Sequence, residues 1–193
     1  MSLDLSRRSV LATGLGLAVA PSALALPPVD IVVRPSRIAR VGSQSFRCAV
    51  GRSGIVRDKH EGDGGTPVGV WPLREVFYRP DRLAIPVTRL PVRALTPDDG
   101  WCDAPADARY NKPVRLPYPA SAEQLWRADH MYDLIVVVGY NDAPVLPGKG
   151  SAIFLHVARS GYTGTAGCVA FARNHLLAIL GAVDKRSRLI VQA

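Results

Sequence analysis

Short runs of β-branched and alternating apolar residues recur along this chain, and they constrain its fold more than any other feature. Alternation with a period of two is typical of half-buried β-strands, because successive side chains point to opposite faces. Glycines in residues 51–54 separate two such runs and predict a hairpin connection there. The pattern therefore predicts a mainly β domain. The expected strands cover residues 30–34, 37–41, 45–50, 70–77, 133–140, 152–157 and 188–191.

Helix signals are few in comparison. Ser121 followed three residues later by Gln124 forms a capping-box pattern, which predicts one short helix from this point. Asn174 is a suitable N-cap for a second helix over residues 175–180, and Gly181 is expected to end it. The sequence thus predicts one or two short helices beside the strands.

The middle of the chain, residues 79–119, is rich in proline and aspartate and shows weak periodicity. Such composition favours long loops over regular elements. We expect these residues to form a loop-rich lid over one end of the β-fold rather than a separate domain.

The N-terminus carries the pattern of an export signal. Arg7 and Arg8 directly precede an apolar stretch over residues 10–20, and residues 23–25 are small enough for a cleavage site. The pattern resembles a twin-arginine signal. The alternative is a buried N-terminal helix, which two glycines and a proline disfavour. About ten apolar residues also fall short of the roughly 20 that span a bilayer.

The sequence therefore predicts export to the periplasm or cell envelope, with no stable membrane span after cleavage. It does not indicate an oligomeric state. The expected segments are a twin-arginine-type signal peptide over 1–25, a linker over 26–30 and one folded domain over 31–193.

The composition is that of a basic globular protein. Hydrophobic residues make up 48% and charged residues 21%, which excludes a disordered polyelectrolyte and a multi-span membrane protein. Lysine and arginine number 24 against 16 acidic residues, a formal charge of +8. The arginines are scattered and no nucleic-acid-binding motif is present, so we expect no nucleic-acid partner. The charge instead predicts affinity for anionic polymers such as those of a bacterial envelope.

Three cysteines are too few for a disulfide-stapled scaffold and include no CxxC pair. After export, Cys48 and Cys102 could form a disulfide that leaves Cys168 as a free thiol. They could equally remain reduced and buried, since the sequence does not say whether they approach bridging distance. Both alternatives stay open.

A histidine and a cysteine in the C-terminal third can carry chemistry. His156 ends an expected strand, and alternation points it the same way as Phe154 and away from Leu155. The loop that follows is made of small, flexible residues and could bring Cys168 beside the imidazole. An imidazole can take the thiol proton and stabilise the thiolate as an ion pair.

Glycine precedes this cysteine and leaves room for a substrate carbonyl. Backbone N–H groups around Gly167 and Cys168 are therefore candidates for holding the oxyanion of an acyl-transfer intermediate. The alternative is that Cys168 is simply a buried core thiol and His156 a core histidine, because free cysteine is among the most buried residue types.

Two motifs resemble a known family. The C-terminal one runs from Gly148 to Phe171 and includes Ser-Ala-Ile-Phe-Leu-His and Thr-Ala-Gly-Cys-Val. The upstream one includes Lys59, Glu-Gly-Asp at 61–63 and Thr-Pro-Val-Gly-Val-Trp-Pro-Leu at 66–73. In this order they are similar to the L,D-transpeptidase catalytic domain family, also called YkuD-type, over most of residues 31–191.

The resemblance implies a mainly β, L,D-transpeptidase-like β-sandwich or barrel that acts on peptidoglycan stem peptides. It implies that Cys168 attacks a diamino acid carbonyl, releases terminal D-alanine and forms an acyl-enzyme, while His156 shuttles protons. An amine from a second stem would then complete a cross-link. The family requires no metal or organic cofactor. An L,D-carboxypeptidase or other cysteine amidase, and a non-catalytic peptidoglycan-binding module, are the alternatives.

This chain departs from the common family pattern near the cysteine. Ala166 and Ala170 stand where many members carry a histidine and a polar or basic residue, so contacts to substrate or acceptor are expected to differ. Candidate substrate-binding residues are Arg173, Thr165 and Tyr140. For Arg173, a solvated charge at a helix start is the alternative.

Other polar residues favour structural roles. The remaining histidines, His60, His130 and His175, lack metal-ligand spacing, so we expect no metal site. Glu61 and Asp63 could be paired carboxylates of a glycosidase, but the glycines around them favour a turn.

Overall fold

The structure is a computed structural model that describes residues 27–193. The expected signal peptide lies outside the described residues. Within them, no helix is both long and apolar enough to cross a bilayer. Most of the regular structure is β, as the sequence predicts, with a single α-helix in the described part of the chain.

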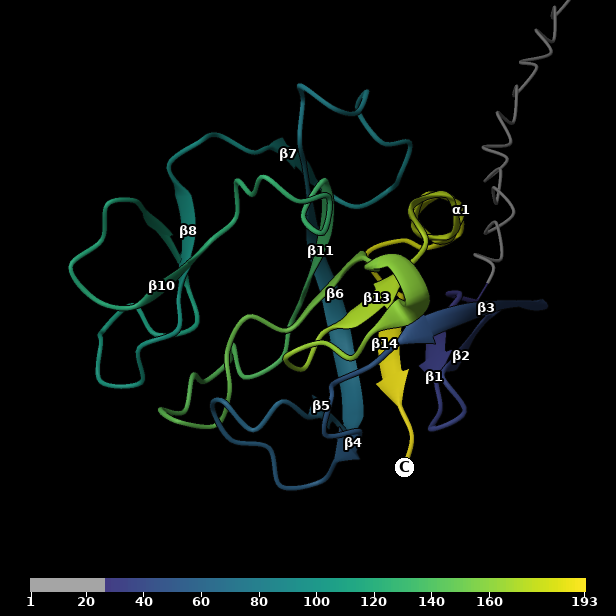
Figure 1. The fold of residues 1–193 in the computed structure, drawn as a ribbon. Helices are drawn as coiled ribbons and strands as arrows, with labels where there is room; N and C mark the ends of the chain where they lie inside the picture. The colour runs from purple at the N-terminus through teal and green to yellow at the C-terminus, as the bar shows by residue number, and fades with distance from the viewer. Residues whose placement is uncertain (1–26) are drawn as a thin grey trace, which may run out of the picture.

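The main sheet has nine strands in the order β11-β12-β13-β3-β2-β1-β14-β6-β7, and β11 also pairs with β6. This last pairing closes the sheet on itself and gives the barrel seen in Figure 1. The predicted strands all form part of it. Its members are β1 (Ile31–Val33), β2 (Ile38–Val41), β3 (Gln44–Ala49), β6 (Gly69–Tyr78), β7 (Val92–Ala94), β11 (Leu134–Val138), β12 (Phe154–Val157), β13 (Val169–Phe171) and β14 (Arg188–Val191).

Strand β6 closes the barrel because it is long enough to pair with three strands, β14, β11 and β7. Its first half pairs with β14 and its second half with β11. The register on β11 shifts between Val136 and Val138, which marks a bulge at this corner. This strand thereby links β14 to β11 and closes the barrel, with β7 as an added edge strand.

Two apolar clusters occupy opposite faces of β12. Leu155 and Val157 belong to the larger cluster inside the barrel. Phe154 belongs to a second cluster outside it, which also contains Cys168 and Tyr132. The predicted alternation along residues 152–157 is therefore confirmed, and the cysteine lies at the edge of the outer cluster.

The α-helix, α1 (Arg173–Ala182), packs against β12 and buries Leu176, Ile179 and Leu180 at helical spacing. It starts before Asn174, after Ala172, with no side-chain cap, so the predicted cap was wrong. Gly181 lies within the helix rather than ending it. Burial of one apolar face therefore determines this helix more than its caps do.

The helix predicted from Ser121 is wrong, because this segment forms β10 (Ala122–Gln124) instead. It pairs with β8 (Asp99–Cys102), which pairs in turn with β9 (Pro113–Arg115), in a separate three-stranded sheet. This sheet lies to one side of the barrel, away from α1 (Figure 1). Leu125 is fully buried in the outer cluster, so tertiary packing outweighs the local capping pattern.

Residues 79–119 are thus more ordered than the sequence indicates, since they contain β7, β8 and β9. Long connections still separate these strands. The segment is part of the same fold and contributes to the outer cluster through Leu95 and Trp101.

The predicted hairpin at residues 51–54 is also wrong. The chain does turn there, with Gly54 N–H donating to the carbonyl of Gly51 at 2.8 Å. The flanking strands do not pair with each other, because β3 pairs with β2 and β13. The following strand, β4 (Ile55–Val56), pairs in parallel with β5 (Thr66–Pro67).

Cys48 and Cys102 are both free and buried. Cys48 lies on β3 of the barrel, whereas Cys102 lies on β8 of the three-stranded sheet. The structure therefore has the reduced, buried arrangement, one of the two that the sequence leaves open.

Candidate active site

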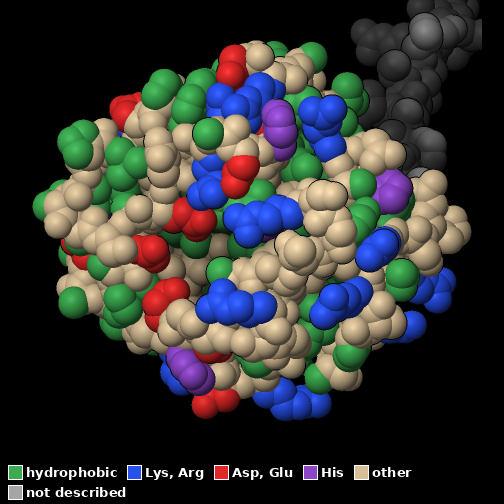
Figure 2. Space-filling view, in the orientation of Figure 1, with side chains coloured by type: hydrophobic (Ala, Val, Ile, Leu, Met, Phe, Trp, Pro, Cys, Tyr) green, Lys and Arg blue, Asp and Glu red, His purple; other side chains and the backbone are tan. Residues whose placement is uncertain are grey.

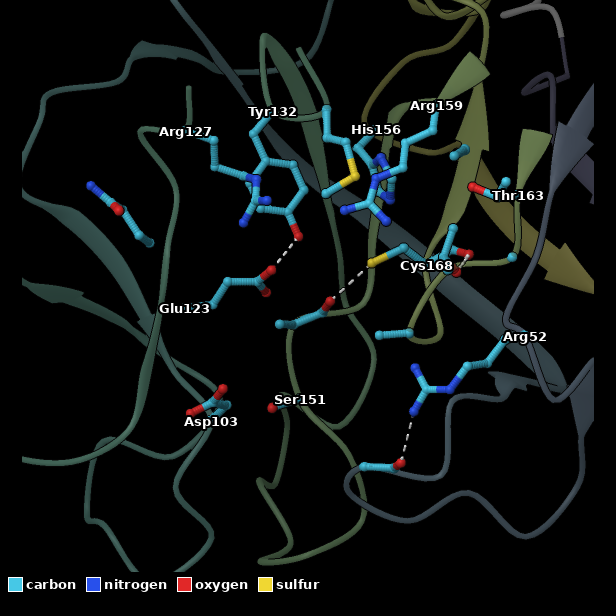
Figure 3. Close-up of a pocket in the computed structure, with 18 of the residues that line it drawn as sticks. Arg52, Asp103, Glu123, Arg127, Tyr132, Ser151, His156, Arg159, Thr163 and Cys168 are labelled. Atoms are coloured by element: carbon cyan, nitrogen blue, oxygen red, sulfur yellow. Dashed lines mark hydrogen bonds between the residues drawn. The ribbon is translucent and has the colours of Figure 1, made fainter. Parts of the chain in front are cut away.

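A cavity of about 500 Å³ opens between the barrel and the three-stranded sheet. Cys168 and His156 both line it, and Figure 3 shows both side chains facing this space. Basic side chains gather over the centre and right of the face in Figure 2, and several acidic ones lie to their left. Charged residues line the cavity itself on several sides: Arg52, Lys59, Glu61, Asp103, Glu123, Arg127 and Arg159.

Parallel pairing of β12 with β13 brings the cysteine and the histidine together. His156 lies opposite Ala170, and Leu155 lies opposite Val169. Cys168 directly precedes Val169, so it is displaced from His156 by two positions along the neighbouring strand and shares its face. The crossover between the strands contains a 3-10 turn, Ser160–Tyr162. The sequence prediction that the loop returns the cysteine to the histidine's side of the sheet agrees with this register.

The sulfur makes two backbone contacts. The Phe154 N–H donates to Sγ at 3.3 Å, and the thiol donates to the Ala152 carbonyl at 3.2 Å. Ala152 has a φ of 50°, an unusual value for a residue with a side chain. Its N–H donates to Asn111 Oδ1 at 3.1 Å, which holds the carbonyl toward the sulfur. The Phe154 N–H donates to the sulfur and therefore favours the thiolate, whereas the Ala152 carbonyl accepts the S–H and therefore favours the thiol.

The imidazole has a defined tautomer. His156 Nδ1 lies 2.9 Å from the carbonyl of Val157, which can only accept a hydrogen bond. Nδ1 therefore carries the proton in the neutral ring, and Nε2 is left with a lone pair. The Tyr132 ring packs edge-on against the imidazole, with centroids 5.4 Å apart.

Burial keeps both groups neutral. It raises the pKa of Cys168 to about 12, with the nearby charge of Glu123 acting in the same direction. It lowers the pKa of His156 to about 4 despite the hydrogen bond to Val157. At neutral pH the resting site is therefore a thiol beside a neutral imidazole. Both pKa shifts favour the neutral pair over the thiolate–imidazolium pair that the sequence suggests.

Two threonines fix the turn before the cysteine. Thr165 Oγ1 accepts from the Gly167 N–H at 3.1 Å and donates to the Cys168 carbonyl at 2.6 Å. Thr66 Oγ1 donates to the Gly167 carbonyl at 2.8 Å. Thr165, a predicted substrate contact, does line the cavity, but its hydroxyl is engaged with the backbone. It therefore acts on the cysteine by positioning the turn.

Gly167 has a φ of 144°, which favours glycine. A Cβ there would lie 2.9 Å from the Gly65 carbonyl oxygen and 3.0 Å from Ile153 Cδ1. Its N–H donates to Thr165 Oγ1. The requirement for glycine at this position is therefore explained by backbone conformation and close packing.

Two predicted substrate-binding residues lie outside this cavity. Tyr140 lines a separate groove with Trp71, against which its ring packs edge-on at 4.9 Å. Its hydroxyl donates to the Lys149 carbonyl. Arg173 is exposed at the start of α1 and does not line the cavity. The structure brings neither side chain to Cys168.

Sequence reasoning missed most of the charged residues in the cavity. Glu61 lies in the upstream motif, where the sequence favours a turn, yet its carboxylate also accepts from Ser151 Oγ at 2.7 Å at the cavity wall. Asp63 does organise the turn, since it accepts from Lys59 Nζ at 2.6 Å and from the Gly65 N–H at 2.8 Å. Arg159 follows His156 by only three residues, and this closeness in sequence was the one signal that could have placed it at the cavity. Glu123 was hidden by the helix prediction.

Within residues 27–193, no three or more His, Cys, Asp or Glu side chains gather where they could hold a metal ion. The cavity instead combines one thiol, one imidazole and charges of both signs. These groups are suited to nucleophilic attack on a carbonyl in a substrate that itself carries charge.

Two solved structures are weakly similar to most of this chain. Solved structures with a similar chain trace include the helical cell shape determining protein Pgp2 from Campylobacter jejuni, at 16% identity and a TM-score of 0.47. Another is an L,D-transpeptidase from Mycobacterium smegmatis, at 14% identity and a TM-score of 0.42. Each match covers 86% of this chain, but 47% and 59% of the other, so the chain spans about half their length. No curated protein matches the chain in sequence.

The family profile of the L,D-transpeptidase catalytic domain, YkuD, matches residues 30–191. This range contains the barrel, the three-stranded sheet and every residue of the cavity described above. The chain therefore belongs to the L,D-transpeptidase catalytic domain family.

Proposed function

We propose that this protein is a cysteine acyltransferase of peptidoglycan that joins stem peptides by L,D-transpeptidation. The observation that carries the proposal is the shared cavity of Cys168 and His156, in a chain of this family. The N-terminal export pattern and the positive charge support work in the cell envelope, where peptidoglycan is found.

In the first half of the reaction, Cys168 Sγ attacks the carbonyl between the diamino acid and terminal D-alanine. Because both groups are neutral at rest, the thiol proton moves from the Ala152 carbonyl side to His156 Nε2 as the C–S bond forms. The imidazolium then protonates the leaving amine as the C–N bond breaks. D-alanine departs, and a thioester on Cys168 remains.

In the second half, an amine of a neighbouring stem attacks the thioester. His156 Nε2 takes a proton from the attacking amine and returns it to sulfur as the C–S bond breaks. The new amide is the cross-link. Water in place of the amine would give a shortened peptide, which is the L,D-carboxypeptidase outcome.

The charges around the cavity match a substrate with both carboxylate and ammonium groups. Arg52 and Arg159 lie on the Cys168 side in Figure 3, and Glu123 and Asp103 lie across from them. Arginine binds carboxylates with directional hydrogen bonds. A stem peptide that spans the cavity would therefore direct its carboxylate toward the arginines and its amino group toward the acidic side.

The experiment is to incubate the mature protein with tetrapeptide muropeptides, with and without an acceptor stem. D-alanine release, protein mass and dimer formation are followed together. We expect an acyl adduct on Cys168, and dimer only when the acceptor is present. The Cys168→Ala variant should release no D-alanine, whereas Cys102→Ala, which removes a buried thiol outside the cavity, should retain activity.

The other outcomes identify the alternatives. D-alanine release without dimer assigns the carboxypeptidase reaction. Retention on wall material without any adduct assigns a binding module. Release that survives in Cys168→Ala overturns the proposal.

A further inference from the structure

A second pair of polar side chains faces the cavity and takes no part in the proton transfers of the scheme above. The Tyr132 hydroxyl donates to Glu123 Oε1 at 2.6 Å across the cavity wall (Figure 3). Glu123 lies on β10 of the three-stranded sheet. Tyr132 lies two residues before the start of β11 of the barrel. Both line the cavity with Cys168. The bond therefore connects the two sheets beside the reacting groups.

The Tyr132 ring is firmly held. It is 3% exposed and packs edge-on against His156 and against Phe154, whose centroid lies 6.1 Å away. The Arg127 guanidinium lies over it, 5.5 Å from the ring centroid. Packing thus fixes the ring, and the hydrogen bond to Glu123 fixes the remaining freedom, the rotation of the hydroxyl proton.

The direction of that proton determines what the hydroxyl can do. Burial raises the pKa of Tyr132 well above its ordinary value, so the phenol stays protonated at neutral pH. A phenol has one O–H to donate, and here the carboxylate receives it. The phenolic oxygen can therefore only accept a hydrogen bond from a group in the cavity.

We propose that Tyr132 Oη accepts a hydrogen bond from the amine or water that attacks the acyl-enzyme, and that Glu123 is a positioning residue that orients Tyr132 for this role. The inference rests on the proposed function. A primary amine carries two N–H bonds: His156 Nε2 takes one proton during attack, and Tyr132 accepts a hydrogen bond from the other. Tyr132 takes no proton itself, and the C–N and C–S bonds change as in the scheme above.

A thiol provides the discriminating nucleophile. It has a single S–H, which is lost on attack, so it has nothing to donate to Tyr132. Loss of the Tyr132 hydroxyl should therefore slow an amine but not a thiol. A distorted site would slow both nucleophiles together.

The test uses the acyl-enzyme formed from a tetrapeptide muropeptide, divided between glycinamide and ethanethiol, a thiol without a hydroxyl group. The readout is the ratio of the two deacylation rates, which does not depend on how fast acylation occurs. In Tyr132→Phe and in Glu123→Ala we expect this ratio to fall about tenfold, the size of one hydrogen bond. The double variant should fall no further, because both substitutions remove the same interaction.

Two variants serve as controls. Glu123→Gln keeps an oxygen that can accept from Tyr132, so it should restore most of the ratio. Tyr118→Phe removes another tyrosine hydroxyl that donates to a carboxylate, that of Asp107 at 2.9 Å, outside this cavity. It should leave the ratio unchanged.

The outcomes separate the inference from the proposed function. A wild-type protein that forms no adduct on Cys168 overturns both. An adduct in wild type with an unchanged ratio in Tyr132→Phe overturns the inference alone. An equal fall in both rates shows a structural role and also overturns it.

Discussion

The neutral resting state of the site gives the sharpest prediction, because it determines how Cys168 reacts with an uncharged alkylating reagent. Only the thiolate reacts, so the rate follows the thiolate fraction. Burial raises the pKa of Cys168 from 9.0 to about 12. At pH 7 this lowers the thiolate fraction about a thousandfold, since each pH unit corresponds to a factor of ten.

The measurement is the alkylation of native protein by iodoacetamide between pH 5 and pH 10. Peptide mass analysis separates Cys168 from Cys48 and Cys102. Limited access to the sulfur slows the reaction equally at every pH, whereas ionisation changes its pH dependence. We therefore expect the Cys168 rate to rise about tenfold per pH unit across the whole range, without a plateau.

His156 provides a second check. Burial lowers its pKa to about 4, so the ring is neutral above that pH and does not stabilise a thiolate at rest. The His156→Asn variant should therefore show the same alkylation profile as wild type while losing acylation of the muropeptide. A plateau in the wild-type rate from about pH 5 upward, lost in this variant, would show a preformed ion pair and refute the reasoning.

Two further predictions concern the turn before the cysteine. Gly167→Ala should lower the free energy of unfolding by about 1–3 kcal/mol, because φ is 144° and the added Cβ would meet the Gly65 carbonyl. Gly181→Ala, in open space within α1, should instead raise the free energy of unfolding by up to about 1 kcal/mol. Urea unfolding midpoints measure both changes, and equal effects of the two substitutions would contradict this prediction. Thr165→Val should lower stability by about 1–3 kcal/mol and reduce acylation, with Thr165→Ser close to wild type, because only the hydroxyl bridges Gly167 and Cys168. Thermal unfolding and adduct formation measure both, and a matching loss in Thr165→Ser would argue against the bridge.

The sequence predicts the barrel well because strand alternation is a local property. Residues 152–157 show this most clearly, since the face that holds His156 follows from a period of two. The short segment after Ser121 shows the limit. Its capping-box pattern favours a helix, but pairing with β8 and burial of Leu125 make it a strand. A pattern of four residues carries too little energy to resist such packing.

The candidate site was predictable only in part. Cys168 and His156 could be paired because a short crossover joins their strands. Glu123 and Arg52 come from segments far apart in sequence, and only the closed barrel and its neighbouring sheet bring them to one cavity. The neutral state of the thiol depends on burial, which the spacing of two residues does not report. The prediction that Tyr140 binds substrate was not met by its position, because an aromatic residue near the motif can line either the Cys168 cavity or the separate groove beside Trp71.

The parallel neighbourhood of β12 and β13 has a consequence for how such a protein can diversify. His156 lies on β12 and Cys168 directly precedes β13, and the backbone hydrogen bonds between these two barrel strands keep the distance between the imidazole and the sulfur constant. Two of the acidic residues around them, Asp103 and Glu123, lie at the end of β8 and on β10 of the three-stranded sheet, outside the barrel. Substitutions in the three-stranded sheet can therefore change the acidic side of the cavity while the pairing of β12 with β13 stays in register.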